Sequence, residues 1–210
     1  MAGICGVADG DRKTVSGLVA PSSSAAARFL VASRVVLELR LGRMMSLFAV
    51  VLLVSTVLCA LVTGFVFTYA VVVMPGLSKL GDREFIRAFQ VTDQIIQNNH
   101  PVFVTVWIGS ILSVVVTMVT ALVGSTGFAG WAAGVTGAVY LIGVQGITVL
   151  VHLPLNNQLQ NVRVDEMDSA SLHEQRELFE ARWTSFNVTR TVISCLVTVS
   201  LMFAVGMQGN

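Results

Sequence analysis

The residues with the clearest chemical potential lie near the end of a long apolar segment. Steps of three or four residues lead from Gln145 through Thr148 and His152 to Asn156, so these polar side chains share one face of a predicted helix. Polar groups in a membrane-spanning helix usually face other helices or a wet cavity, because leaving them in lipid costs several kcal/mol. The spacing therefore predicts a polar pocket at this end of the helix.

The other two histidines are expected on the same side of the protein. His100 immediately precedes an apolar segment, and His173 lies in a polar connection. The three histidines show neither HxxxH nor HExxH spacing, and the acidic residues near them form no ligand pattern. We therefore predict hydrogen-bonding histidines and no metal site. A metal or haem site built from two or three of them is the alternative.

The composition is typical of a membrane protein. Of 210 residues, 54% are hydrophobic and 12% are charged, and the net charge is +1. Nucleic-acid partners are excluded, because they would require a clustered basic surface. Four segments, at about 45–74, 102–123, 128–153 and 190–206, are long and apolar enough to cross a hydrocarbon core of roughly 30 Å. We predict an integral, multi-pass membrane protein embedded in a lipid bilayer.

Two polar connections, at 75–101 and 154–191, join the spans on one side. The first predicts an amphipathic helix capped by Asp82. The second contains the capping-box pattern SLHE at 171–174, and because neither proline nor glycine follows before Gly206, its helix is expected to run unbroken into the fourth span. In the first helix, the apolar stripe consists of Phe85, Phe89, Thr92 and Ile96. The remaining faces carry Arg83, Arg87 and Asp93.

Small and hydroxyl side chains recur at helical spacing in three spans, which favours close packing between helices. In the third span, Pro154 is expected to limit how far the helix continues regularly. We predict an all-α fold, a membrane four-helix bundle with two extramembrane amphipathic helical connections on one side. The recurring residues are Ser110, Ser113, Thr117 and Thr120; Gly130, Gly134 and Ala138; and Thr191, Ser194 or Cys195, and Thr198.

Residues 1–43 form an N-terminal extension to the four-span domain at 44–210. Three interpretations stay open: a targeting segment, a disordered tail, or an extension upstream of a start at Met44 or Met45. Six basic residues precede the first span. By the positive-inside rule, they place both termini in the cytoplasm and the two polar connections on the opposite side.

Four stretches, taken in order, resemble the anthrone-oxygenase-like family of small four-span membrane proteins, many of which are known only as a domain of unknown function. They are VVVMPGLSKL (71–80), FIRAFQVTDQIIQNNHPVF (85–103), VHLPLNNQL (151–159) and ARWTSFNVTR (181–190). The resemblance covers roughly residues 45–206. It implies oxidation of anthrones to anthraquinones with molecular oxygen and without an established cofactor, so no cofactor is expected. Its motif points to Met74, Pro75, Gly76, Phe89, Gln90, Asn98, Pro101, Pro154, Asn156, Leu159, Arg182, Trp183, Asn187 and Arg190.

One hypothesis is an oxygenase that binds a planar, hydrophobic aromatic molecule between the helices. Trp183 and Phe89 would stack on its rings, and His152 would take a proton from the reacting carbon. Asn156, Gln90 and Arg190 would stabilise the developing oxyanion. The catalytic candidates are His152, Arg190 and Asn156, and the substrate-binding candidates are Trp183, Phe89, Gln90, Asn98, His100, Arg182 and Asn187.

The competing hypothesis is a non-enzymatic membrane protein. It would be a small subunit or assembly factor packed against a membrane-protein partner, or a lipid-binding component. Asn156, Arg182 and Arg190 would then tie the outer helices to the spans and matter for stability alone. Haem or quinone binding is a third interpretation.

Overall fold

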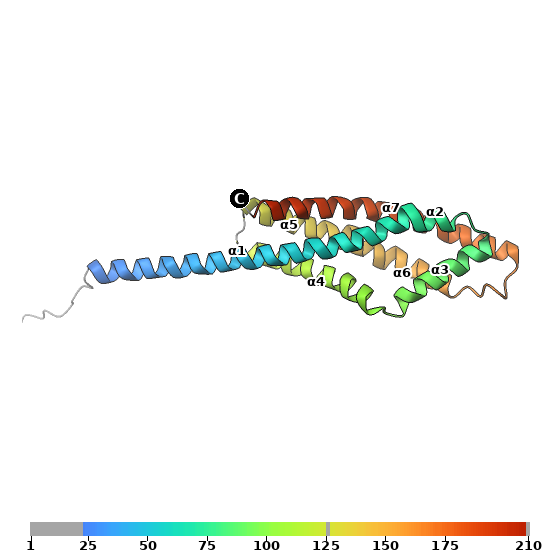
Figure 1. The fold of residues 1–210 in the computed structure, drawn as a ribbon, viewed down its shortest axis with the longest axis horizontal. Helices are drawn as coiled ribbons and strands as arrows, with labels where there is room; N and C mark the ends of the chain where they lie inside the picture. The colour runs from blue at the N-terminus through green and yellow to red at the C-terminus, as the bar shows by residue number, and fades with distance from the viewer. Residues whose placement is uncertain (1–22, 125–126, 209–210) are drawn as a thin grey trace, which may run out of the picture. The chain divides into compact units, whose positions relative to one another are not determined.

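The computed structural model describes residues 23–124 and 127–208, which are helical apart from short turns (Figure 1). The symbol η denotes a π-helix, whose turns are wider than those of an α-helix. The elements are α1 (Ser23–Thr68), η1 (Tyr69–Val73), α2 (Met74–Leu77), α3 (Asp82–Gln97), α4 (Pro101–Gly124), α5 (Gly127–Val139), η2 (Tyr140–Gly146), η3 (Thr148–His152), α6 (Leu153–Gln160) and α7 (Ser169–Gly206).

The chain divides into two compact units, Met1–Arg40 and Leu41–Asn210. In the first unit, residues 23–40 form the N-terminal part of α1. The helix thus begins within the predicted N-terminal extension, whereas residues 1–22 of that extension lie outside the described residues. All the features considered below belong to the second unit.

Four helical stretches are long and apolar enough to cross a membrane: Leu47–Leu77, Pro101–Gly124, Gly127–Gln160 and Ser169–Gly206. They confirm the predicted all-α fold of an integral, multi-pass membrane protein. Successive stretches run in opposite directions, so that α2, α3 and α6 gather at one end, and the end of α4 and the start of α5 lie at the other (Figure 1). At the start of α5, Gly127 adopts a φ of +62°, a conformation that favours glycine.

Hydroxyl groups join the spans as the sequence predicted. Ser55 on α1 bonds to Thr117 on α4 at 2.8 Å, and Thr63 bonds to Thr198 on α7 at 2.9 Å. Such bonds hold helices together in lipid, where no hydrophobic force acts between them.

The predicted small-residue seam of the third span is rotated in the structure. Gly130 is buried as expected, but the seam continues through Ala133 and Gly137. A Cβ at Gly137 would lie 2.8 Å from the Met118 side chain and 3.0 Å from that of Val114 on α4, whereas one at Gly134 would meet nothing within 4 Å. The prediction of Gly134 and Ala138 as the packed positions was therefore wrong.

The third span contains two π-helical segments, η2 and η3, and then continues as α6 to Gln160. Pro154 was expected to limit how far the helix continues regularly; the helix runs past it to Gln160, after π-helical turns that interrupt the regular α-helix. A proline ring clashes with the carbonyl four residues earlier in an α-helix, and the wide turns of η3 immediately before α6 relieve that clash. Likewise η1 directly precedes α2, which contains Pro75. η1 and η3 contribute Tyr69 and His152, respectively, to the cavity described below.

Helix α7 runs unbroken from Ser169 to Gly206, which confirms that the second connection continues into the fourth span. Its N-cap is Asp168, which accepts a bond from the Ser171 backbone N–H at 2.9 Å. Hydrogen bonding by the Ser171 hydroxyl, and then by its backbone N–H, lowers the pKa of Asp168. The predicted cap at Ser171 is thus three residues too late. At α3 the N-cap is Gly81 rather than Asp82.

Helix α3 packs against α6 and α7 through a second hydrophobic core outside the bundle core. Phe85, Ile86 and Phe89 are buried on its inner face, and Asp93 continues that face with 2% of its surface exposed. Thr92, which the stripe included, is exposed. The apolar stripe was therefore wrong at Thr92, because the next buried position after Phe89 is occupied by a carboxylate, whereas Ile96 is half-buried.

Candidate functional site

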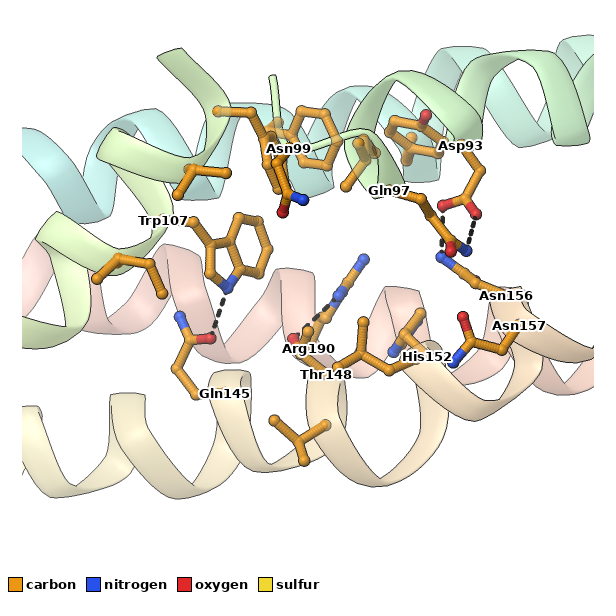
Figure 2. Close-up of a pocket in the computed structure, with 18 of the residues that line it drawn as sticks. Asp93, Gln97, Asn99, Trp107, Gln145, Thr148, His152, Asn156, Asn157 and Arg190 are labelled. Atoms are coloured by element: carbon orange, nitrogen blue, oxygen red, sulfur yellow. Dashed lines mark hydrogen bonds between the residues drawn. The ribbon is translucent and has the colours of Figure 1, made fainter. Parts of the chain in front are cut away.

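A cavity of about 460 Å³ lies between the ends of the helices on the α3 side of the bundle (Figure 2). It is enclosed by α3, α4, the third span, α7 and the end of the first span. Its walls are mainly aromatic and aliphatic, with Phe65, Tyr69, Phe89, Phe103, Trp107 and Trp183 among the aromatic side chains.

A hydrogen-bonded bridge closes the cavity toward the membrane centre. Trp107 on α4 donates its Nε1–H to Gln145 Oε1 at 2.9 Å, and Gln145 donates to the Tyr140 hydroxyl at 2.8 Å. Tyr140 in turn bonds to Ser110 at 2.7 Å. The bridge satisfies the polar groups of a glutamine inside the span and joins α4 to η2.

A second network, centred on Asp93, closes the other end (Figure 2). The carboxylate accepts bonds from the side-chain amides of Asn156 at 2.8 Å, Gln97 at 2.7 Å and Gln160 at 3.1 Å. Asn156 also accepts the indole N–H of Trp183 at 2.8 Å. Both ends of the Asn156 amide are therefore occupied, and the network ties α3 to α6 and α7.

Arg190 on α7 brings an uncompensated cation into the cavity. It is 4% exposed, donates to Asn187 Oδ1 at 3.0 Å and to the Thr148 hydroxyl at 3.1 Å, and lies 5.9 Å from the Trp183 ring centre. Within residues 23–124 and 127–208, no carboxylate lies within salt-bridge distance of it. A guanidinium has five N–H donors, so three are left for a ligand.

His152 stands on the cavity wall between Thr148 and Asn156. Its ring packs edge-on against Trp183 with centroids 5.0 Å apart, and its Nδ1 lies 3.4 Å from the Ile147 carbonyl oxygen. A carbonyl accepts only, so this contact favours the tautomer with the ring proton on Nδ1. Nε2 is buried and has no hydrogen-bond partner in the described part of the chain.

A family model described as anthrone oxygenase matches residues 94–200. The chain belongs to the anthrone oxygenase family. The comparisons with curated proteins and with solved structures gave no match. In this member of the anthrone oxygenase family, the matched segment begins on α3 and ends on α7, so it includes every cavity residue except Phe65, Tyr69, Phe89 and Asp93.

The structure brings together half of the site residues predicted from the sequence of this anthrone oxygenase family member. His152, Asn156, Arg190, Trp183 and Phe89 all line the cavity.

The other predicted site residues do not line the cavity. Asn187 is buried behind Arg190 and donates to the Val66 carbonyl at 3.2 Å. Gln90 donates to the backbone of Leu159 and Val162, and Asn98, His100 and Arg182 are exposed.

Sequence reasoning missed Asp93, Gln97 and Trp107 as residues that line this cavity. A signal was present for two of them, because Phe85, Phe89, Asp93 and Gln97 follow one another at steps of four on one helix face. Trp107 gave no such signal, since an indole in an apolar span is ordinary.

The three histidines do not meet. His173 bonds to Asp82 at 3.1 Å, and His100 is exposed at the start of α4. No group of three His, Cys, Asp or Glu side chains in the described parts of this anthrone oxygenase family member is arranged to hold a metal ion.

Proposed function

We propose that the protein is a membrane-embedded oxygenase that binds a planar, electron-rich aromatic ketone of the anthrone type and oxidises it to a quinone with molecular oxygen. The observation that carries the proposal is Arg190, a buried guanidinium with spare donors and no acidic partner within the described residues, inside an aromatic-walled cavity. The family membership names the same class of reaction.

The cavity suits such a ligand in size and chemistry. Pockets for small molecules commonly measure about 300–1,000 Å³ and are mostly apolar with few polar groups. The 460 Å³ cavity has that character, with Trp107 and Trp183 among its flat aromatic walls. Arg190 would bind the ketone oxygen, because a buried charged donor gains most from an oxygen that becomes negative.

Arg190 and His152 divide the chemistry between them. Removing a proton from the CH₂ carbon opposite the ketone leaves negative charge on the ketone oxygen, where Arg190 stabilises it. We assign the base to His152, because its Nε2 has no hydrogen-bond partner in the described part of the chain; Nε2 is buried, so the ring must turn toward the cavity to reach the substrate. Asn156 and Gln90 were expected to stabilise the oxyanion. The amide of Asn156 already donates to Asp93, and that of Gln90 donates to backbone carbonyls.

The reaction balances with one molecule of oxygen. The carbanion adds to O₂ to form a C–O bond, and protonated His152 returns its proton to the peroxide. Loss of the second C–H proton then breaks the O–O bond and expels hydroxide. The carbon ends as a carbonyl that keeps one oxygen atom, and the other atom leaves as water.

The test is oxygen consumption by purified protein supplied with 1,8-dihydroxyanthrone, corrected for the spontaneous reaction. We expect Arg190→Met to lower the rate by about 10²–10³-fold, the usual effect of removing an oxyanion donor. His152→Gln should lower it by about 10²–10⁴-fold, as expected for a general base.

Two exposed residues provide matched controls. Arg163 and His173 have side chains that are 76% and 60% exposed and lie outside the cavity. Arg163→Met and His173→Gln should keep the wild-type rate. If the wild type consumes no oxygen above the background, or if the cavity variants match the controls, the oxygenase proposal fails and the non-enzymatic hypothesis gains.

We further propose that the cavity lies on the non-cytoplasmic side. Six basic residues precede the first span, and by the positive-inside rule they retain the amino terminus in the cytoplasm. Single cysteines at exposed positions 79 and 163 should react with an impermeant maleimide added outside intact cells; labelling only after lysis would reverse the orientation.

A further inference from the structure

The cavity has a mouth on the lipid-facing surface, between α4 and the third span. Three of its lining residues also face outward: Ile108 on α4 is 48% exposed, Val149 on η3 is 57% exposed and Leu153 on α6 is 48% exposed. Within the described residues, α4 packs closely along α5 but not along η3 or α6. Figure 1 shows α4 diverging from α6 toward its α3 end.

Hydrogen-bonded networks and buried side chains line the other sides of the cavity. The Trp107–Gln145 bond blocks the end nearest the membrane centre. The Asp93 network lies at the end under α3, and Trp183 and Arg190 of α7, which are 2% and 4% exposed, form the back wall. Among the described residues, the apolar lining side chains that face outward all lie between α4 and the third span, so a ligand dissolved in lipid would enter there.

The mouth has one polar and one apolar rim. Gln97, Asn99 and Asn157 line the cavity and are exposed, whereas the opposite rim consists of Ile108, Val149 and Leu153. Ile108 lies about 10 Å along α4 from Pro101, at 1.5 Å per residue. The polar rim is thus at the level of the helix ends, and the apolar rim is about two turns deeper.

From this arrangement we infer that the cavity is filled sideways from the bilayer, at the depth where lipid headgroups meet acyl chains. The inference deepens the proposed function and depends on the cavity being the ligand site. The mouth fits an amphipathic planar aromatic that is dissolved in the membrane and enters with its polar edge toward the headgroups. Residues of the apolar rim then control how fast a ligand enters and leaves, with little effect on how tightly it is held.

The test uses 1,8-dihydroxyanthraquinone, a quinone that cannot be oxidised by the proposed reaction, and full-length protein in phosphatidylcholine nanodiscs. Quenching of tryptophan fluorescence by the bound quinone reports binding, in a Trp131→Phe background because Trp131 is 66% exposed and outside this cavity. Rapid mixing gives the association rate, and dilution into excess vesicles gives the dissociation rate.

Ile108→Phe combined with Val149→Phe should lower both rates by at least about tenfold and leave Kd within about twofold. Ile108→Ala combined with Val149→Ala should raise both rates. The matched controls are Leu112→Phe and Leu150→Phe, because these residues are 60% and 75% exposed on the same helices but do not line the cavity. The controls should bind and release the quinone at wild-type rates.

Unchanged rates in both the narrowed and the widened variants would overturn the lateral route, and so would an absence of quinone binding to the wild type. The proposed function can fail separately. If the rates change as expected but the anthrone is not oxidised, the lateral route is supported and the oxygenase proposal is refuted. If the anthrone is oxidised and the rates do not change, the oxygenase proposal is supported and the lateral route is refuted.

Discussion

Replacing Arg190 by methionine should make the protein more stable while removing its activity. Arg190 is nearly fully buried without an acidic partner in the described part of the chain, and burying an ion costs several kcal/mol even after relaxation. Such a cost is retained when a residue serves a ligand rather than the fold. The competing hypothesis, in which Arg190 ties α7 to the spans, predicts the opposite sign.

The magnitude follows from the contacts of the side chain. The substitution removes two hydrogen bonds, to Asn187 and Thr148, worth together about 3 kcal/mol. It also removes the desolvation cost of the guanidinium and leaves an apolar side chain of similar length against Trp183. We expect a net gain of about 1–3 kcal/mol, which for a chain of this size raises Tm by roughly 2–10 °C.

Thermal unfolding in detergent, followed by circular dichroism without ligand, measures the change. Arg163→Met is the control, since Arg163 is exposed and its substitution should alter the free energy of unfolding by less than about 0.5 kcal/mol. A lower Tm for Arg190→Met than for the control would refute the reasoning and identify Arg190 as part of the structural framework.

Two further predictions concern the framework that holds the cavity. Gly137→Ala should lower the Tm, because its Cβ would press on Val114 and such overpacking costs about 1–3 kcal/mol of stability. Gly134→Ala should raise the Tm slightly, because alanine has the better helix propensity and its Cβ would contact nothing. Equal shifts of the two variants in a melting experiment would contradict the rotated seam. Asp93→Leu should lower the free energy of unfolding by about 2–4 kcal/mol, since the amide donors lose their acceptor. In the control Asp165→Leu, the replaced carboxylate is 80% exposed, so the loss should be less than about 1 kcal/mol. Similar losses in both variants would show that the Asp93 network contributes little.

The sequence predicted the architecture well because membrane spans are specified by length and composition. The four apolar segments, the helix over α3 and the long helix α7 were all confirmed, since no alternative satisfies their backbone groups in lipid. Details that depend on packing were less accurate. Whether Gly134 or Gly137 meets α4 depends on the rotation of the helix, which a run of small residues does not determine.

The candidate site was predictable only where polar residues interrupt an apolar face. Gln145, Thr148, His152 and Asn156 showed this pattern, and all four line the cavity. Asp93 was assigned to a solvent-facing side because a carboxylate on an amphipathic helix is usually hydrated. Its burial depends on three amide donors, two of them from a segment more than 60 residues away, which no local pattern reveals.

The π-helical turns could not be predicted either, although two of the three described, η1 and η3, follow a physical rule. Each precedes a proline that would otherwise collide with the preceding turn, and each changes which side chains face the cavity. Tyr69 on η1 and His152 on η3 line the cavity from such turns. Here the sequence indicated a break, and the structure shows a continuous but wider helix.

The most direct test of the central claim is the equilibrium affinity of 1,8-dihydroxyanthraquinone for the wild type and for Arg190→Met, measured by tryptophan quenching. Hydrogen bonds from a charged donor are worth about 1.5–3 kcal/mol, so the account predicts binding by the wild type and a loss of roughly 10- to 150-fold in the variant, with Arg163→Met unchanged. Equal affinity in the wild type and in Arg190→Met would contradict it, because the cavity would then hold the quinone without using the Arg190 guanidinium.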